Sequence, residues 1–141
     1  MKRLPIQYIY MLCLGIALLT TVSCAKEPDQ IPHVSMNLSL QVEQYARLWT
    51  PGGYEYITGG YNGLVVYRVD EYSFRVYDRA CPHDYEKNCR VYVDESGLML
   101  IDSACGSRYN ILDGGVIDGP ASSPLKAYRN RFDGIYLYIT N

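Results

Sequence analysis

The fold is decided by three short segments, which read CPH at residues 81–83, DSACGSRY at 102–109 and GPA at 119–121. The first two contain residue types that ligate metals, namely Cys with His in one and Asp with Cys in the other. Each is flanked by β-forming residues, so we expect both to lie on loops between strands. We call residues 81–83 the first box and residues 102–109 the second box, and we take them as the candidate site.

The chain around these boxes predicts an all-β protein. Residues 34–42 place an apolar side chain at every second position, as in a strand buried on one face. Residues 44–50 either continue that strand or form a short turn. The other predicted strands are residues 54–58, 64–69, 73–77, 90–93, 98–101, 125–129 and 135–139. Most neighbours in this series are close enough to form hairpins, and a total of roughly nine short strands indicates a small sandwich or barrel.

Residues 1–23 have the pattern of an export signal. Lys2 and Arg3 form a basic start, residues 6–20 are almost wholly apolar, and small residues lead to Cys24. This pattern predicts a lipoprotein whose mature chain begins at a lipidated Cys24. The alternative is an uncleaved anchor, although the apolar core is shorter than the roughly 20 residues that a membrane span needs.

Residues 24–33 predict a tether between the lipid and the domain, because the segment is polar, charged and interrupted by proline. Lys26 and Glu27 resemble a short charged signal that sends lipoproteins to the outer face of the outer membrane. We therefore expect a lipoprotein of the cell envelope, held in the outer membrane through Cys24 and facing the periplasm or the surface. Residues 34–141 would form its one domain.

Composition excludes two classes of function. The formal net charge is -2 and charges of both signs are mixed along the chain, so no basic stripe is present for nucleic acid. The sequence has no nucleophile paired with a base, no acid pair at helical spacing and no phosphate-binding loop. We therefore expect neither a nucleic-acid partner nor a self-contained enzyme.

The order of these segments resembles the Rieske [2Fe-2S] domain family. A hairpin over residues 64–79 is followed by the first box, then by CGSRY at 105–109 and GVIDGPA at 115–121, so that the resemblance covers about residues 64–139. It implies stacked antiparallel sheets that carry a cluster at the tip of a small subdomain, which the two boxes form. It also implies an electron-transfer role with an unidentified redox partner.

The resemblance also implies the ligands, since Rieske sites place two Cys on one iron and two His on the other. Cys81 and His83 match the first box of the family. Aligning the Gly-Ser of the second box puts Asp102 where the family has Cys, and Cys105 where it has His. The eighteen residues between His83 and Asp102 are close to the family spacing, so we interpret both differences as substitutions.

Two hydroxyl residues of the second box match positions that surround the cluster in high-potential members of the family. There the serine donates a hydrogen bond to a bridging sulfide and the tyrosine donates one to a cysteine sulfur. Ser107 and Tyr109 occupy these positions. Asp102 has a simpler reading as well, because an Asp that ends a strand often caps the following turn.

Three chemical outcomes remain open at this site. The first is a [2Fe-2S] cluster held by Cys81, His83, Cys105 and Asp102, in which thiolate in place of imidazole would lower the reduction potential. The second is a cluster-free domain in which Cys105 forms a disulfide with Cys89, as the resemblance implies, or with Cys81. The third is zinc held by Cys81, His83, Cys89 and Cys105, whose spacing lacks the usual CxxC pairs. A domain without a cluster would be a structural or binding lipoprotein.

Overall fold

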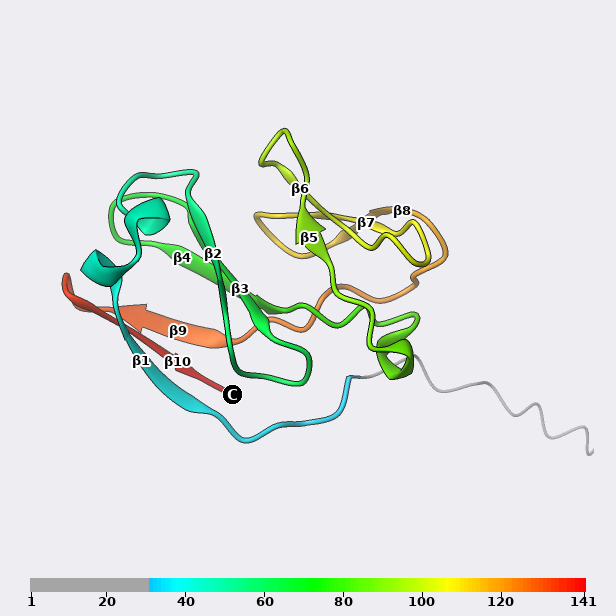
Figure 1. Ribbon diagram of the computed structural model, residues 1–141, viewed down its shortest axis with the longest axis horizontal. Coiled ribbons are helices and arrows are strands. Elements are labelled where there is room, and N and C mark those ends of the chain that lie inside the picture. Colours follow the sequence, from blue (N-terminus) through cyan, green and yellow to red (C-terminus); the bar gives the residue numbers. More distant parts are fainter. Residues whose placement is uncertain (1–30) are drawn as a thin grey trace, which may run out of the picture.

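The computed structural model describes residues 31–141, which form a nearly all-β domain (Figure 1). The expected signal at residues 1–23, the expected lipid site at Cys24 and most of the expected tether at 24–33 lie outside the described residues. Within 31–141, no helix has the length and apolar character needed to cross a membrane. The strands are β1 (Asn37–Gln41), β2 (Tyr54–Ile57), β3 (Leu64–Arg68), β4 (Phe74–Asp78), β5 (Tyr92–Val93), β6 (Met99–Ile101), β7 (Arg108–Asn110), β8 (Val116–Asp118), β9 (Arg129–Phe132) and β10 (Tyr136–Thr140). Three single-turn 3-10 helices accompany them: η1 (Val42–Gln44), η2 (Ala46–Leu48) and η3 (Tyr85–Lys87).

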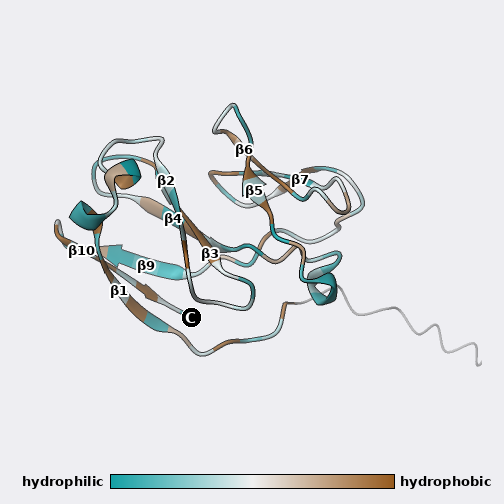
Figure 2. Ribbon diagram, viewed as in Figure 1, coloured by the Kyte–Doolittle hydropathy of each residue, from teal (hydrophilic) through white to brown (hydrophobic). Residues whose placement is uncertain are grey.

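Two three-stranded antiparallel sheets, ordered β1-β10-β9 and β2-β3-β4, form the larger part of the domain. They enclose a core that includes Leu40, Leu64, Val66, Phe74, Val76, Leu137 and Ile139. β9 is the hydrophilic strand of the pair of sheets (Figure 2), and it lies at a sheet edge. Charged side chains on an edge strand discourage pairing with other chains.

A smaller four-stranded sheet, ordered β5-β6-β7-β8, carries the second box between β6 and β7. β3 joins the core of this small sheet to the core of the larger sheets, because β3 is apolar on both faces. Leu64 and Val66 face the core of the larger sheets, whereas Val65 and Tyr67 belong to the core shared with the small sheet. A strand buried on both faces is expected to read as a continuous apolar run, as LVVY does here.

The structure confirms the all-β prediction and most of the predicted strands. The hairpins expected at 64–69 with 73–77 and at 90–93 with 98–101 are β3 with β4 and β5 with β6. Residues 44–50 form the turn alternative, as η1 and η2. Sequence patterns did not predict β7 and β8 as strands, because segments of three residues are too short to show a period.

The strand predicted at 125–129 begins later, as β9 at Arg129. The preceding residues bond to the edge of β4 instead, with Asp78 N donating to Lys126 O at 2.8 Å and Tyr128 N donating to Val76 O at 2.9 Å. The chain then crosses to β10. Burial of Leu125 and Tyr128 explains the displacement, because both side chains pack into cores before the hairpin begins.

Asp78, at the end of β4, is a fully buried carboxylate with four donors. It accepts hydrogen bonds from Tyr61 N at 2.6 Å, Asn62 N at 3.1 Å, Ala80 N at 2.9 Å and Tyr128 Oη at 2.8 Å. These donors come from the β2–β3 loop, the residue that precedes the first box and the segment before β9. Asp78 therefore joins three parts of the chain that are distant in sequence.

Gly60 is required by this arrangement. Its φ is +64°, and a Cβ placed there would lie 2.5 Å from Asp78 Oδ2 and 2.8 Å from the Tyr128 hydroxyl oxygen. Any side chain would therefore push against the carboxylate and its donor, in a backbone conformation that already favours glycine.

We expect Asp78→Asn to lower the free energy of unfolding by about 3 kcal/mol, because it replaces a charged acceptor of four bonds with a neutral amide. Tyr128→Phe is the matched control, since it removes one of the four donors and should cost about 1 kcal/mol. Urea unfolding followed by circular dichroism measures both. Equal losses in the two variants would contradict a central role for Asp78.

Candidate functional site

The first box lies on a loop that is closed at its base by backbone pairing. An isolated bridge joins Ala80 to Arg90, and η3 fills the loop between them. The second box is a tight turn after β6, in which Asp102 N donates to Ser107 O at 2.9 Å and Gly106 N donates to Asp102 O at 2.8 Å. Each box is thus fixed at the end of a strand.

The GPA segment supports the second box from outside. Ala121 N donates to Ser107 Oγ at 3.1 Å. Gly119 has a φ of +103°, and a Cβ there would lie 2.5 Å from Ser107 Cα. The glycine is therefore needed so that the two segments can approach so closely.

The two boxes bring three of the four predicted ligand residues together. Ligand atoms of Cys81, Asp102 and Cys105 all lie within 4.8 Å of one another, and the Cys81 and Cys105 Sγ atoms are 3.4 Å apart. Cys81 and Asp102 are completely buried, whereas Cys105 is half-buried. The site thus opens from a buried side towards the surface.

His83 and Cys89 are placed differently. Among the described residues neither side chain belongs to the group within 4.8 Å, although His83 is half-buried on the same loop as Cys81. The Cys89 Sγ contacts Lys87 O at 3.7 Å. All three cysteines in residues 31–141 are free thiols, with Cys105 lying against Cys81. Among residues 31–141, neither the Cys3His zinc set nor the complete set of four cluster ligands therefore lies within 4.8 Å, and the disulfide pairing stays a prediction.

Asp102 carries the most informative atom of the site. Its Oδ1 accepts a hydrogen bond from Ala104 N at 2.7 Å, so this oxygen caps the turn as the sequence suggested. Its Oδ2 is buried and has no hydrogen-bond partner among the described residues. A buried carboxylate oxygen without a partner is costly, and a bound cation is one of the explanations for it. With two sulfurs beside it, this donor set suits iron or another thiophilic metal.

The sulfur of Cys81 is protonated at neutral pH in this arrangement. Burial raises the pKa of its thiol to about 12, a hydrogen bond with the Tyr109 hydroxyl opposes that rise, and Asp102 and Cys105 add to it. A metal is bound by thiolate, so metal binding would displace this proton.

The two predicted hydroxyl residues both contact the sulfurs. The Tyr109 Oη lies 3.2 Å from Cys81 Sγ, and burial raises the pKa of Tyr109 so that it keeps its proton for donation. Ser107 Oγ accepts a hydrogen bond from Cys105 Sγ at 3.0 Å. The contact between Tyr109 and a cysteine sulfur is the one that the resemblance implied.

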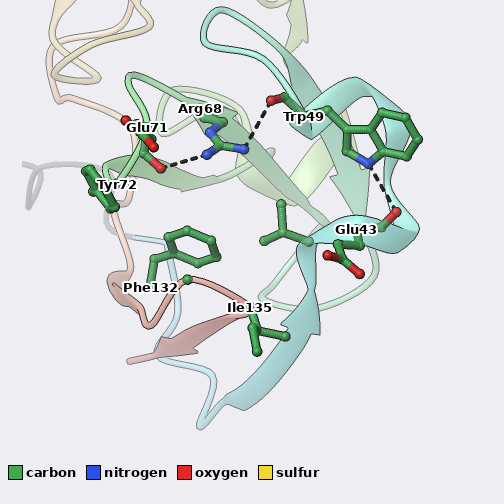
Figure 3. Close-up of a pocket in the computed structure, with 9 residues that line it drawn as sticks. Glu43, Trp49, Arg68, Glu71, Tyr72, Phe132 and Ile135 are labelled. Carbon is green, nitrogen blue, oxygen red and sulfur yellow. Dashed lines mark hydrogen bonds between the residues drawn. The ribbon is translucent and has the colours of Figure 1, made fainter.

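A groove of about 610 Å³ lies elsewhere on the domain, and none of the candidate ligands lines it. Arg68 lies at its centre and donates hydrogen bonds to Trp49 O at 3.3 Å and Glu71 O at 2.6 Å (Figure 3), and also to Leu48 O at 2.7 Å. The exposed Trp49 donates from Nε1 to Glu43 O at 3.0 Å. Because its guanidinium is held by backbone carbonyls, we assign Arg68 a structural role.

Arg79 and Arg90 are residues near the site that sequence patterns did not single out. Both line a separate pocket at the base of the first-box loop. The available signal was their position, since they stand just before and just after the segment that contains Cys81 and Cys89.

Comparison with known proteins identifies the fold through structure alone. No family model matches the chain, and no curated protein matches its sequence. The ferredoxin of carbazole 1,9a-dioxygenase from Nocardioides aromaticivorans IC177 is similar with a TM-score of 0.51 at 16% identity, covering 77% of this chain and 98% of its own. A chain of the complex of reduced oxygenase and oxidized ferredoxin in carbazole 1,9a-dioxygenase gives a TM-score of 0.52 at 20% identity, covering 74% and 92%. The domain therefore has a Rieske-like fold, in which Cys81 of the first box meets Asp102 and Cys105 of the second.

Proposed function

We propose that this chain is an electron-transfer module that holds a [2Fe-2S] cluster between its two boxes. The observation that carries the proposal is the buried, unpartnered Asp102 Oδ2 beside the thiols of Cys81 and Cys105. It lies where two loops of a Rieske-like fold meet. The similar structures include a ferredoxin, which supports electron transfer as the role.

Burial suggests how the four ligands would divide between the two irons. Cys81 and Asp102 are completely buried and occupy the positions of the family's cysteine pair. His83 and Cys105 are half-buried and occupy the positions of the histidine pair. We therefore assign the first pair to an inner iron and the second to an outer iron, where a redox partner would dock.

The bound cluster would supply one-electron transfer, and the residues around it would set its potential. Cys105 contributes a negative thiolate in place of a neutral imidazole, which stabilises the oxidised state and lowers the potential. The Tyr109 hydroxyl bonded to Cys81 acts in the opposite direction, because hydrogen bonds to sulfur stabilise the more negative reduced state. We expect the substitution of the ligand to outweigh one hydrogen bond.

Membrane attachment is part of the proposal. The basic start, apolar core and Cys24 of residues 1–24 support export and lipidation, and the polar residues that follow support a tether. The domain would then stay at the outer membrane and reach a redox partner within the length of its tether.

A second candidate function rests on the 3.4 Å between the Cys81 and Cys105 Sγ atoms. A small approach would bring them to the roughly 2.05 Å of a disulfide, which an exported protein is free to form. Closing this loop would stabilise the domain by on the order of 3 kcal/mol. The chain would then be a cluster-free structural or binding lipoprotein.

Anaerobic reconstitution of the full chain with iron and sulfide separates the two candidates. We expect visible absorption, an EPR signal on reduction and about two irons per chain. Cys81→Ala should abolish all three, because it removes the innermost sulfur ligand. A colourless protein in which peptide mapping without reductant finds Cys81 joined to Cys105 would instead support the disulfide.

The ligand assignment is tested by restoring the residues of the family. The double variant Asp102→Cys with Cys105→His should bind the cluster with a reduction potential higher than that of the wild type by roughly 100 mV or more. Cys89→Ser is the control and should leave the potential unchanged, since Cys89 Sγ contacts Lys87 O and not the ligand group. Protein-film voltammetry measures the potentials. An unchanged potential in the double variant would refute the assignment.

A further inference from the structure

A pocket of about 450 Å³ lies between the β2–β3 loop and the base of the first-box loop. The glycine-rich segment at residues 59–63 forms one side of it, and Arg79 and Arg90 form part of the other. The β2–β3 loop and the segment that follows β4, which supply these residues, can be followed in Figure 1. The pocket includes none of the proposed cluster ligands, so it is a second site.

Arg79 and Arg90 are both held in place by a hydrogen bond from Nε. Arg79 Nε donates to Val91 O at 2.9 Å, and its guanidinium carbon lies 3.9 Å from the centre of the Tyr56 ring. Arg90 Nε donates to Asn62 Oδ1 at 3.0 Å. Among residues 31–141, no acceptor bonds the terminal Nη groups of either side chain. Two guanidiniums fixed through Nε thus keep their terminal Nη donors available.

The positive charge of this pair is not neutralised locally. Within the described part of the chain, no carboxylate forms an ion pair with Arg79 or Arg90. Asp78 is the nearby buried acid, and its oxygens are already engaged by four donors. Burial lowers the pKa of Arg79, and the like charge of Arg90 lowers it further. Both cations line the same pocket, so their like charges repel each other.

An anion placed between them would remove that repulsion. Guanidinium groups bind oxyanions through two parallel N–H···O bonds, and arginine is the residue most suited to carboxylate and phosphate. The volume of about 450 Å³ is in the range of small-molecule sites. We propose that this pocket binds a small oxyanion, phosphate or carboxylate, through the Nη groups of Arg79 and Arg90.

Such a ligand would also fasten the loop of the first box. Arg79 and Arg90 stand at the two ends of that loop, next to the bridge between Ala80 and Arg90. Asn62, which holds Arg90, also donates from Nδ2 to Cys89 O at 2.8 Å. An oxyanion that joins the two arginines would therefore hold both ends of the loop together, whether or not a metal is bound.

Thermal unfolding of the metal-free full chain in detergent tests the site. Sodium phosphate, sodium acetate and sodium chloride are compared at equal ionic strength. We expect phosphate or acetate to raise Tm saturably, by about 5 °C, beyond the effect of chloride. A rise with phosphate alone, with acetate alone or with both supports the proposal and identifies which oxyanion the pocket accepts.

The variant that decides the matter is Arg90→Gln, because Arg90 is exposed and its replacement should leave the fold intact. It should lose the rise in Tm, as should Arg79→Gln where circular dichroism shows a native spectrum. Arg108→Gln, on β7 and outside the pocket, should keep the rise. No rise beyond chloride in the wild type, or an equal rise in Arg90→Gln, would overturn the proposal.

Discussion

The carboxylate of Asp78 is the constraint on which the placement of both sites depends. It is completely buried, so the four donors that surround it must stay in place to offset the cost of removing a charge from water. One donor, Ala80 N, fixes where the first box begins. Another, Asn62 N, positions the side chain that holds Arg90 and the Cys89 carbonyl. The loop that contains Cys81 is thus held in place by Asp78, which is not one of the proposed ligands.

Sequence patterns predicted those parts of the fold that local periodicity determines. The apolar run of β3 and its hairpin with β4 were evident because a strand buried on both faces has a distinctive composition. β7 and β8 were not evident, because each is three residues long. The displaced start of β9 has a similar cause, since the bond from Tyr128 N to the β4 edge is a long-range contact that no local pattern encodes.

The candidate site, too, was predictable only in part from the sequence. The resemblance identified Cys81, Asp102 and Cys105, and the fold brings their ligand atoms within 4.8 Å. The pair of Arg79 and Arg90 could not be predicted, because eleven sequence positions separate them and nothing in their spacing shows that neither forms an ion pair with a described carboxylate. Absence of a partner is a property of three-dimensional packing. It becomes visible only when every nearby carboxylate has been placed.

The ligand atoms of Cys81, Asp102 and Cys105 also allow the two proposed chemistries, disulfide and metal, to be compared. A disulfide between Cys81 and Cys105 would satisfy both sulfurs but would leave Asp102 Oδ2 buried without a partner. That cost would persist in the oxidised domain, because the cap from Ala104 N accounts for Oδ1 and not for Oδ2. The proposed metal centre would engage both sulfurs and the free carboxylate oxygen at once, and its positive charge would offset the burial of three anionic ligands. The identity of residue 102, more than the distance between the thiols, is therefore the reason to favour a metal.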